Sequence, residues 1–497
     1  MAGDRSVFTV ADLSSEQKED SKAHDGKSQS VTGGDSMKIG SFEIPFRPRS
    51  LELFDSKARQ SFSLSGEIFA GVTVGLIALP LALALGIASV PAGTETLLPP
   101  PALGIFTAII AGFLISLLGG SRVQIGGPTA AFVPIILLIV IEQGYVSLLL
   151  ATMMAGIILI LMGVTRMGSL IKFIPWPVTS GFTTGIAVAI MLTQVPDFTG
   201  MRVAEAMPRE FFEKIPWMLE HAGAISLHEL GLAVACVAII LLWPRCKIKA
   251  IPGTIVAIVV ATVFVTVAGW QEAHGVSTIG SKFGADAIPT GLLMPSLPTW
   301  DFGMVRDLIG PATAIALLGA IESLLSAVVA DGLTDDRHDS NTELIAQGIA
   351  NLVCPLFGGL PATGAIARTS ANVNSGGKTP LAGMIHAATL LGIILLAARW
   401  AVYIPTAAMS SVLIVVALRM GEWHELQRLN RIPRSDALVL LTTFLLTVIF
   451  DLVIAVEIGM VLAAILYIKR VSETTEVSPV TADDMLERPE HIAQGKD

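Results

Sequence analysis

The sequence predicts an all-α polytopic membrane protein with about fourteen transmembrane segments in two inverted repeats of seven. Three observations support this fold class. The chain of 497 residues is 53% hydrophobic and only 15% charged, a balance that lies outside the ordinary range of soluble chains. Apolar stretches of roughly the 20 residues that a spanning helix needs recur between residues 66 and 467. A Gly-Gly and Pro pattern also occurs once in each half of the chain.

The apolar stretches indicate helices, because lipid offers the backbone no hydrogen-bond partners and only helices or closed barrels satisfy it internally. Unbroken runs such as 135–141 lack the alternation of a barrel strand. The expected helix cores are 66–90, 102–118, 128–141, 144–164, 177–195, 227–244, 250–269, 306–330, 342–357, 364–374, 380–398, 404–418, 435–450 and 453–468.

These helices divide the chain into five parts. Residues 1–62 are polar and give no signal peptide, so we expect a disordered cytoplasmic tail. The first repeat is expected over 63–270, an external loop over 271–303, the second repeat over 304–470 and a short cytoplasmic tail over 471–497.

Lysine and arginine gather in the loops on one side of this topology, which the positive-inside rule assigns to the cytoplasm. Both termini are then cytoplasmic, and the protein is expected in the inner membrane. The expected external loop 196–226 departs from the pattern with three basic residues, Arg202, Arg209 and Lys214.

The two Gly-Pro motifs are Gly126-Gly127-Pro128-Thr129-Ala130-Ala131 and Gly358-Gly359-Leu360-Pro361-Ala362-Thr363-Gly364-Ala365, each a Gly-Gly pair, then a proline, then small residues. They open the third and tenth apolar segments, which are both unusually short. Glycine permits unusual backbone conformations, and proline favours the first turn of a helix. Two half-helices with their positive N-terminal ends near the bilayer midplane form an anion site, although kinks or close helix packing would produce the same residues.

Two charged residues within the predicted spans are functional candidates. Glu322 is a candidate proton carrier, since a carboxyl in a poorly hydrated cavity is more easily protonated; a structural carboxyl is the alternative. Arg368 follows the second motif, and substrate or Glu322 is expected to balance its charge.

Other polar features do not indicate an enzyme. The 376–379 segment resembles the end of a Walker A loop, but Asn372 stands where its first glycine belongs. The three cysteines lack metal-ligand spacing. The acidic segment 331–339 is expected to be a solvated network. We therefore expect no cofactor, no resident metal and no nucleic-acid partner.

At these residues the chain resembles the SulP (sulfate permease) family of anion transporters, which in animals includes pendrin and prestin. The resemblance covers about residues 43–470 and rests on four segments: 78–84, 126–132, 318–338 and 357–368. It implies core and gate domains, an elevator-like movement of the core and a homodimer. Most family members carry a STAS domain after the last span, and no such domain is evident in this sequence.

The resemblance also implies the site residues and the substrate class. The anion is expected between the starts of the third and tenth spans, near Leu85, Thr129, Ala130, Phe132, Ala365, Ile366, Ala367 and Arg368. Family substrates are sulfate, bicarbonate, chloride and C4-dicarboxylates. The Glu322-Ser323 pair resembles the bacterial proton-coupled dicarboxylate branch, which makes sodium a less expected coupling ion than the proton. The alternatives are a nucleobase permease of the same fold and an anion channel or exchanger.

Overall fold

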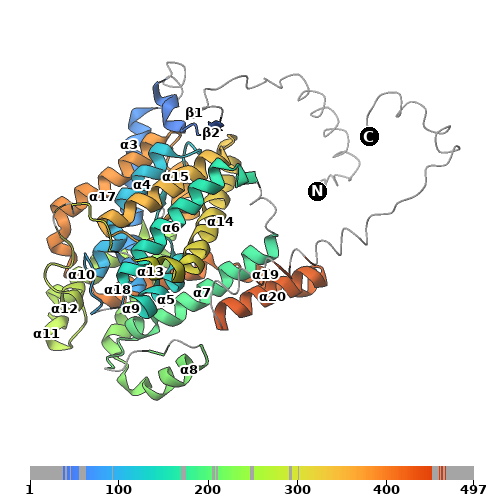
Figure 1. Cartoon of the computed structure of the whole chain (residues 1–497). Helices are drawn as coiled ribbons and strands as arrows, with labels where there is room; N and C mark the ends of the chain where they lie inside the picture. The colour runs from blue at the N-terminus through green and yellow to red at the C-terminus, as the bar shows by residue number, and fades with distance from the viewer. Residues whose placement is uncertain are drawn as a thin grey trace, which may run out of the picture. The chain divides into compact units, whose positions relative to one another are not determined.

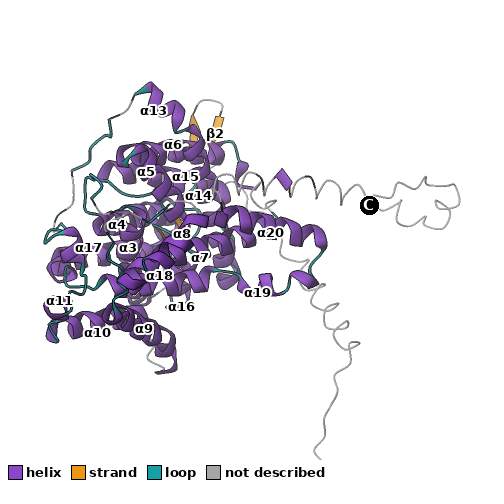
Figure 2. Ribbon diagram, turned by 90° about the horizontal axis from the view of Figure 1, so that it is seen from below, coloured by secondary structure: helices purple, strands orange, loops and turns teal. Residues whose placement is uncertain are grey.

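The structure is a computed structural model that describes residues 37–39, 42–44, 46–54, 63–91, 93–169, 175–203, 207–208, 211–246, 251–289, 291, 294–299 and 301–449, with four single positions at 458, 461, 462 and 465. Every predicted stretch up to residue 450 contains a helix, which confirms the all-α fold class. The last stretch, 453–468, lies almost entirely outside the described residues. Figure 2 shows how completely helix dominates.

Among the described residues, seven helices are long and apolar enough to cross a bilayer. Three apolar segments are shorter: Ala130–Gln143, Gly253–Val267 and Thr406–Met420.

One group of helices, the core, contains segments from both halves of the sequence packed against one another. In Figure 1 the blue α3 and α4 lie beside the orange α17 and the yellow α15. The core consists of α3 (Leu64–Ser89), α4 (Pro100–Leu118), α5 (Val133–Gln143), α6 (Tyr145–Val164), α14 (Ile309–Thr334), α15 (Ser340–Val353), α16 (Ile366–Asn374) and α17 (Pro380–Ala401).

A second group, the gate, is equally mixed in sequence. The two helices α7 and α20 run side by side in both views, and α18 packs on α7 and α9. The gate consists of α7 (Trp176–Thr199), α9 (Leu227–Leu242), α10 (Gly253–Val267), α18 (Thr406–Met420) and α20 (Arg434–Ile449). It meets the core where α3 contacts α10 and α18.

The two halves of the chain repeat the same order of elements. The first helix of each half, α3 and α14, has 26 residues. The third segment of each half is short: α5 has 11 residues and α16 has 9. A nine-residue helix is roughly 14 Å long, less than half the hydrocarbon thickness of about 30 Å. Neither helix is therefore long enough to cross the bilayer by itself, as expected for half-helices.

Short elements connect these helices. The 3-10 helices are η1 (Arg49–Phe54), η2 (Ala130–Phe132), η4 (Ala222–Ala224), η5 (Trp243–Cys246), η6 (Cys354–Phe357) and η7 (Leu429–Arg431). The short α-helices are α8 (Phe211–Glu220), α11 (Trp270–Ala273), α12 (Ile279–Phe283), α13 (Phe302–Asp307) and α19 (Trp423–Gln427). The strands are β1 (Met37–Ile39), β2 (Phe42–Ile44), β3 (Gly126–Gly127) and β4 (Thr363–Gly364).

Part of the segment 1–62, which is expected to be a disordered tail, belongs to the described residues. The strands β1 and β2 pair as an antiparallel hairpin. Within η1, the Arg49 amide donates to Gly119 O at 3.0 Å, and its Nη1 pairs with Glu52 at 2.6 Å. Glu52 also pairs with Arg122 at 2.7 Å, and Arg122 lies 3.4 Å from Asp336. These ion pairs fix η1 to the core, and composition alone does not reveal them.

This ionic cluster gives the protein an acid-sensitive contact. Burial raises the pKa of Glu52, but the hydrogen bonds and charges of Arg49 and Arg122 outweigh it and hold that pKa below its usual range. A depressed folded-state pKa adds stability above the unfolded value of about 4.3, and this stability disappears as the pH falls through the folded value. Glu52→Gln should therefore lower the thermal midpoint of the detergent-solubilised protein at pH 7. We expect that difference to shrink as the pH falls below the ordinary glutamate pKa, and a constant difference would contradict the assignment.

The closest helix contact in the core depends on glycine. A Cβ at Gly104 of α4 would lie 1.9 Å from Ala82 O of α3, which is a backbone atom and cannot turn away. Gly104→Ala should thus cost about 1–3 kcal/mol through overpacking and lower the thermal midpoint. Gly392→Ala in α17 is the matched control, because nothing lies within 4 Å of its Cβ position. Equal midpoints for the two variants would contradict the packing.

Candidate functional site

The two halves of the chain meet in a two-residue antiparallel ladder. Gly126 faces Gly364 and Gly127 faces Thr363, and the Ala365 amide extends the pairing by donating to Ile125 O at 2.8 Å. All these residues are buried. The sequence motif in the second half is therefore displaced, since Thr363-Gly364 rather than Gly358-Gly359 is the partner of Gly126-Gly127. Gly358 instead ends η6 in a left-handed conformation, with φ 72°.

A short helix begins just after each strand of the ladder. Thr129 precedes η2, which runs into α5, and Ala365 precedes α16. Neither residue caps its helix with a side-chain hydrogen bond. The expectation that Pro128 and Pro361 start these helices is wrong: both lie upstream, and Pro134 occupies the first turn of α5. The first amides of a helix have no partner within that helix, which makes a helix start a typical place for an anion.

Glu322 lies in the middle of α14 and faces the first of these helix starts. Its Oε2 accepts a hydrogen bond from Thr129 Oγ1 at 2.9 Å. Both side chains are half-buried, whereas the neighbouring Ser323 and Ser326 are fully buried. Glu322 thus retains some exposure where Ser323 and Ser326 have none.

Arg368, which is expected near the substrate, has a buried side chain that contacts the loop of the first-half motif. Its side chain is 2% exposed, and its guanidinium donates to Gly126 O at 3.4 Å and to Pro128 O. A Cβ at Gly127, where φ is 142°, would lie 2.6 Å from Arg368 Nη1. The guanidinium therefore stabilises the first-half loop at Gly126 and Pro128 by donating hydrogen bonds to their backbone carbonyls. It remains close enough to Glu322 for a direct charge–charge interaction.

The remaining predicted site residues fall into two sets. Ile366 is 42% exposed and Ala367 is also exposed, whereas Thr129 and Glu322 are half-buried; we refer to these partly exposed residues at the two helix starts as the opening. The others are covered by their neighbours: Leu85 1%, Phe132 1%, Ala130 6% and Ala365 8% exposed. Phe132 packs toward Gly319 of α14. The second set shapes the site without facing the opening.

Sequence reasoning missed a group of buried polar side chains that position the ladder. Gln124 Nε2 donates to Ser323 O at 3.1 Å, and Thr369 Oγ1 accepts from the Ile125 amide at 3.1 Å. Thr369 also bonds Ser326 at 3.1 Å, and Asn372 Nδ2 donates to Val123 O at 2.8 Å. The signal in the sequence is that Gln124, Thr369 and Asn372 are polar and lie within ten residues of a glycine motif.

The Walker-like loop has a structural role. The Lys378 amide, which begins the turn into α17, donates to Glu67 Oε1 at 3.0 Å. Within the described part of the chain, no three His, Cys, Asp or Glu residues are grouped for a metal ion. In the acidic segment, Asp331 pairs instead with His338 at 2.7 Å. At the end of α7, Asp197 pairs with Lys282 at 2.7 Å.

A sequence profile described as the sulfate permease family matches residues 64–443. The putative sulfate transporter YvdB of Bacillus subtilis is 41% identical over 411 residues, which cover 83% of this chain and 75% of that protein. The bicarbonate transporter BicA of Picosynechococcus is 33% identical over 434 residues, covering 85% and 73%.

Solved structures give the same result for the fold. The transmembrane domain of a cyanobacterial bicarbonate transporter BicA superposes with a TM-score of 0.69 at 32% identity, covering 79% of this chain and 97% of that one. The structure of SLC26A9 has a TM-score of 0.75 at 16% identity, covering 95% and 72%. At that identity the second likeness concerns the fold alone.

Proposed function

Because the chain belongs to the sulfate permease family, we propose that it is a secondary active transporter of small anions that couples uptake to protons. The chain is a multi-pass membrane protein of a transporter family and not an enzyme. One observation carries the proposal: uncapped starts of two half-helices, one from each repeat, meet at the β3–β4 ladder, with Glu322 and Thr129 at its open edge.

The chemistry of this opening favours an anion over a nucleobase. The amides at the starts of η2 and α16 offer hydrogen-bond donors and positive dipole ends. Arg368 adds a buried positive charge behind the ladder. A site of this kind recognises charge more than chemical identity. The relatives named above as sulfate and bicarbonate transporters make these two anions the first substrates to test, with the dicarboxylate fumarate third.

The proposed cycle moves the core as one body against the gate. The ladder, Glu322 and Arg368 all belong to the core, so the anion and a proton on Glu322 would move together. The thin contact of α3 with α10 and α18 is the surface along which this elevator movement would run. Location in the inner membrane, cytoplasmic termini and a homodimer belong to the same proposal.

Uptake into proteoliposomes tests this function. Labelled sulfate, bicarbonate and fumarate are offered separately under an inward proton gradient, with and without an uncoupler. Accumulation of one anion that collapses with the uncoupler supports a proton-coupled carrier. Flux that only follows the anion gradient would instead support a channel or exchanger.

The opening itself has its own prediction. Ala367→Phe places a ring where Ala367 is exposed, beside Glu322, and should reduce uptake at least about tenfold, the effect of losing about 1.4 kcal/mol. The thermal midpoint should not change, because the site has room on its open side. Ala273→Phe on α11, another exposed alanine, is the matched control. Normal uptake by Ala367→Phe would remove this opening from the anion path.

A further inference from the structure

A second cavity, distinct from the anion opening, lies between the core and the gate. It has a volume of about 250 Å³ and is bounded by α3 and α17 of the core and α10 of the gate. Its walls include Leu79 and Leu83 of α3, Val259 and Val263 of α10, and Ile393 and Ala397 of α17. The cavity therefore spans the surface along which the two groups of helices would move.

The walls offer nothing to a polar ligand. Apart from Thr262 and the indole of Trp400, every lining residue is aliphatic. The Thr262 hydroxyl donates to Ile258 O of its own helix at 2.7 Å, so it is already satisfied. An apolar cavity of this kind excludes water, which finds no hydrogen-bond partners there. The occupant has to be apolar.

The cavity borders the surface that faces the bilayer. Val259 and Val263 are 53% and 56% exposed, and Leu396 and Trp400 of α17 are 77% and 57% exposed. In a membrane-spanning segment, exposed aliphatic surface is covered by acyl chains. Acyl chains therefore reach the cavity directly from the bilayer.

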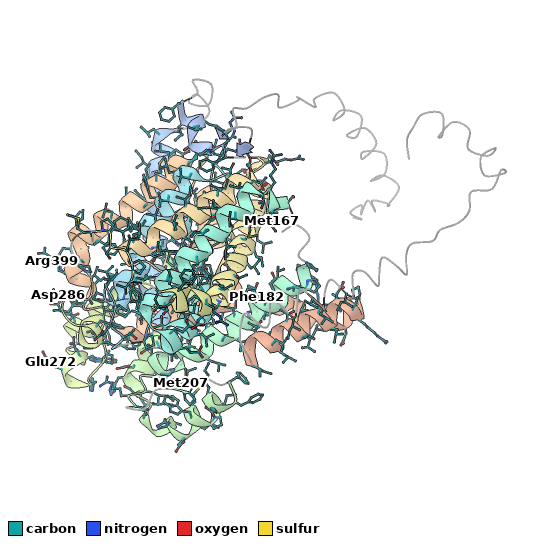
Figure 3. The ribbon with its side chains drawn as sticks, in the orientation of Figure 1. Met167, Phe182, Met207, Glu272, Asp286 and Arg399 are labelled. Carbon is teal, nitrogen blue, oxygen red and sulfur yellow. The ribbon has the colours of Figure 1, made fainter. Side chains whose placement is uncertain are left out.

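A charged group stands beside the hydrophobic entrance. Arg399, in the last turn of α17, is exposed, and its guanidinium carbon lies 4.6 Å from the centroid of the Trp400 ring. Figure 3 shows Arg399 at the outer edge of the helices in that view. Tryptophan and arginine are typical of the depth at which headgroups lie. A guanidinium there complements the phosphate of a phospholipid.

We propose that this cavity binds one acyl chain of a phospholipid whose phosphate pairs with Arg399. The chain inserts between α10 of the gate and α3 and α17 of the core. Because its two walls belong to groups of helices that move relative to one another, the bound chain makes the transport rate depend on the lipid. The proposal holds whichever anion is carried.

Photo-cross-linking tests the site on the full chain. The protein is reconstituted in phosphatidylglycerol vesicles that contain a trace of the same lipid with a diazirine in its acyl chain, and labelled peptides are identified by mass spectrometry. We expect adducts on α10 and α17. Ala397→Phe fills the cavity and should reduce them at least fivefold, whereas Leu396→Phe, on the lipid-facing side of the same helix, should not. Val263→Phe repeats the test from the gate wall in case Ala397→Phe does not fold.

Other outcomes would overturn the proposal. Equal labelling of the Ala397→Phe and Leu396→Phe proteins means that the chain does not enter the cavity. Equal labelling by a diazirine fatty acid that lacks a phosphate, or no change in Arg399→Gln, removes the phospholipid headgroup from recognition. Cross-links between two copies of the chain at α17 mean that a partner subunit covers this face instead.

Discussion

Glu322→Gln is expected to abolish proton-driven accumulation while anion exchange continues. Glutamine keeps the length of the side chain and its hydrogen bond with Thr129, but it cannot take up or release a proton. With a gradient of one pH unit, symport with one proton supports about tenfold accumulation, since one pH unit corresponds to about 1.4 kcal/mol. In proteoliposomes with the membrane potential clamped, this ratio should fall to one in the variant. Counterflow of labelled anion against unlabelled anion measures the retained exchange.

The matched control for this variant is Glu272→Gln on α11, which makes the same chemical change at an exposed position. It should accumulate the anion like the unaltered protein. Persistent tenfold accumulation by Glu322→Gln would mean that another group carries the proton. Loss of both accumulation and exchange would mean that the carboxylate is required for anion binding.

Arg368→Met is expected to destabilise the protein and to eliminate uptake together. The guanidinium donates to two buried carbonyls, Gly126 O and Pro128 O, and the variant leaves both without a partner. Hydrogen bonds from charged groups contribute about 1.5–3 kcal/mol each, so a loss of about 3–6 kcal/mol is expected for the two. Thermal unfolding in detergent measures the loss, and proteoliposome uptake measures the function.

The Arg368→Lys variant distinguishes the effect of the positive charge from that of the planar guanidinium geometry. A lysine retains the positive charge but cannot hold both carbonyls in the same geometry, so partial stability with poor uptake is expected. Arg306→Gln, an exposed arginine in α13, is the control. Full stability and uptake in Arg368→Met would exclude the role assigned to the guanidinium.

The positions of the helices were predictable from the sequence, because an apolar stretch in lipid has few structural options. The same is true of the two half-helices, whose short lengths and glycine motifs mark them. The register of the β3–β4 ladder was not predictable. A two-residue pairing carries no periodicity, and Gly358-Gly359 resembles the first-half motif more closely than the true partner, Thr363-Gly364, does.

The directions in which side chains point were also not predictable from the sequence. Arg368 lies at the start of α16, where sequence reasoning places its charge toward the substrate. Only the position of the other repeat shows that backbone carbonyls behind the ladder occupy the guanidinium. In the same way, η1 is polar and reads as disordered until Arg122 and Asp336 are brought beside it.

The ladder also imposes an order of events on biosynthesis. Arg368 and its acceptor Gly126 are 242 residues apart. At 5–20 residues per second, roughly 12–50 s pass between the synthesis of the two. During that interval the first repeat is in the bilayer while the carbonyls of Gly126 and Pro128 lack their donor, where no water replaces it. The first half of the chain therefore has to persist in the bilayer with these two carbonyls unpaired. The speed of translation between the two halves then influences how much protein escapes degradation.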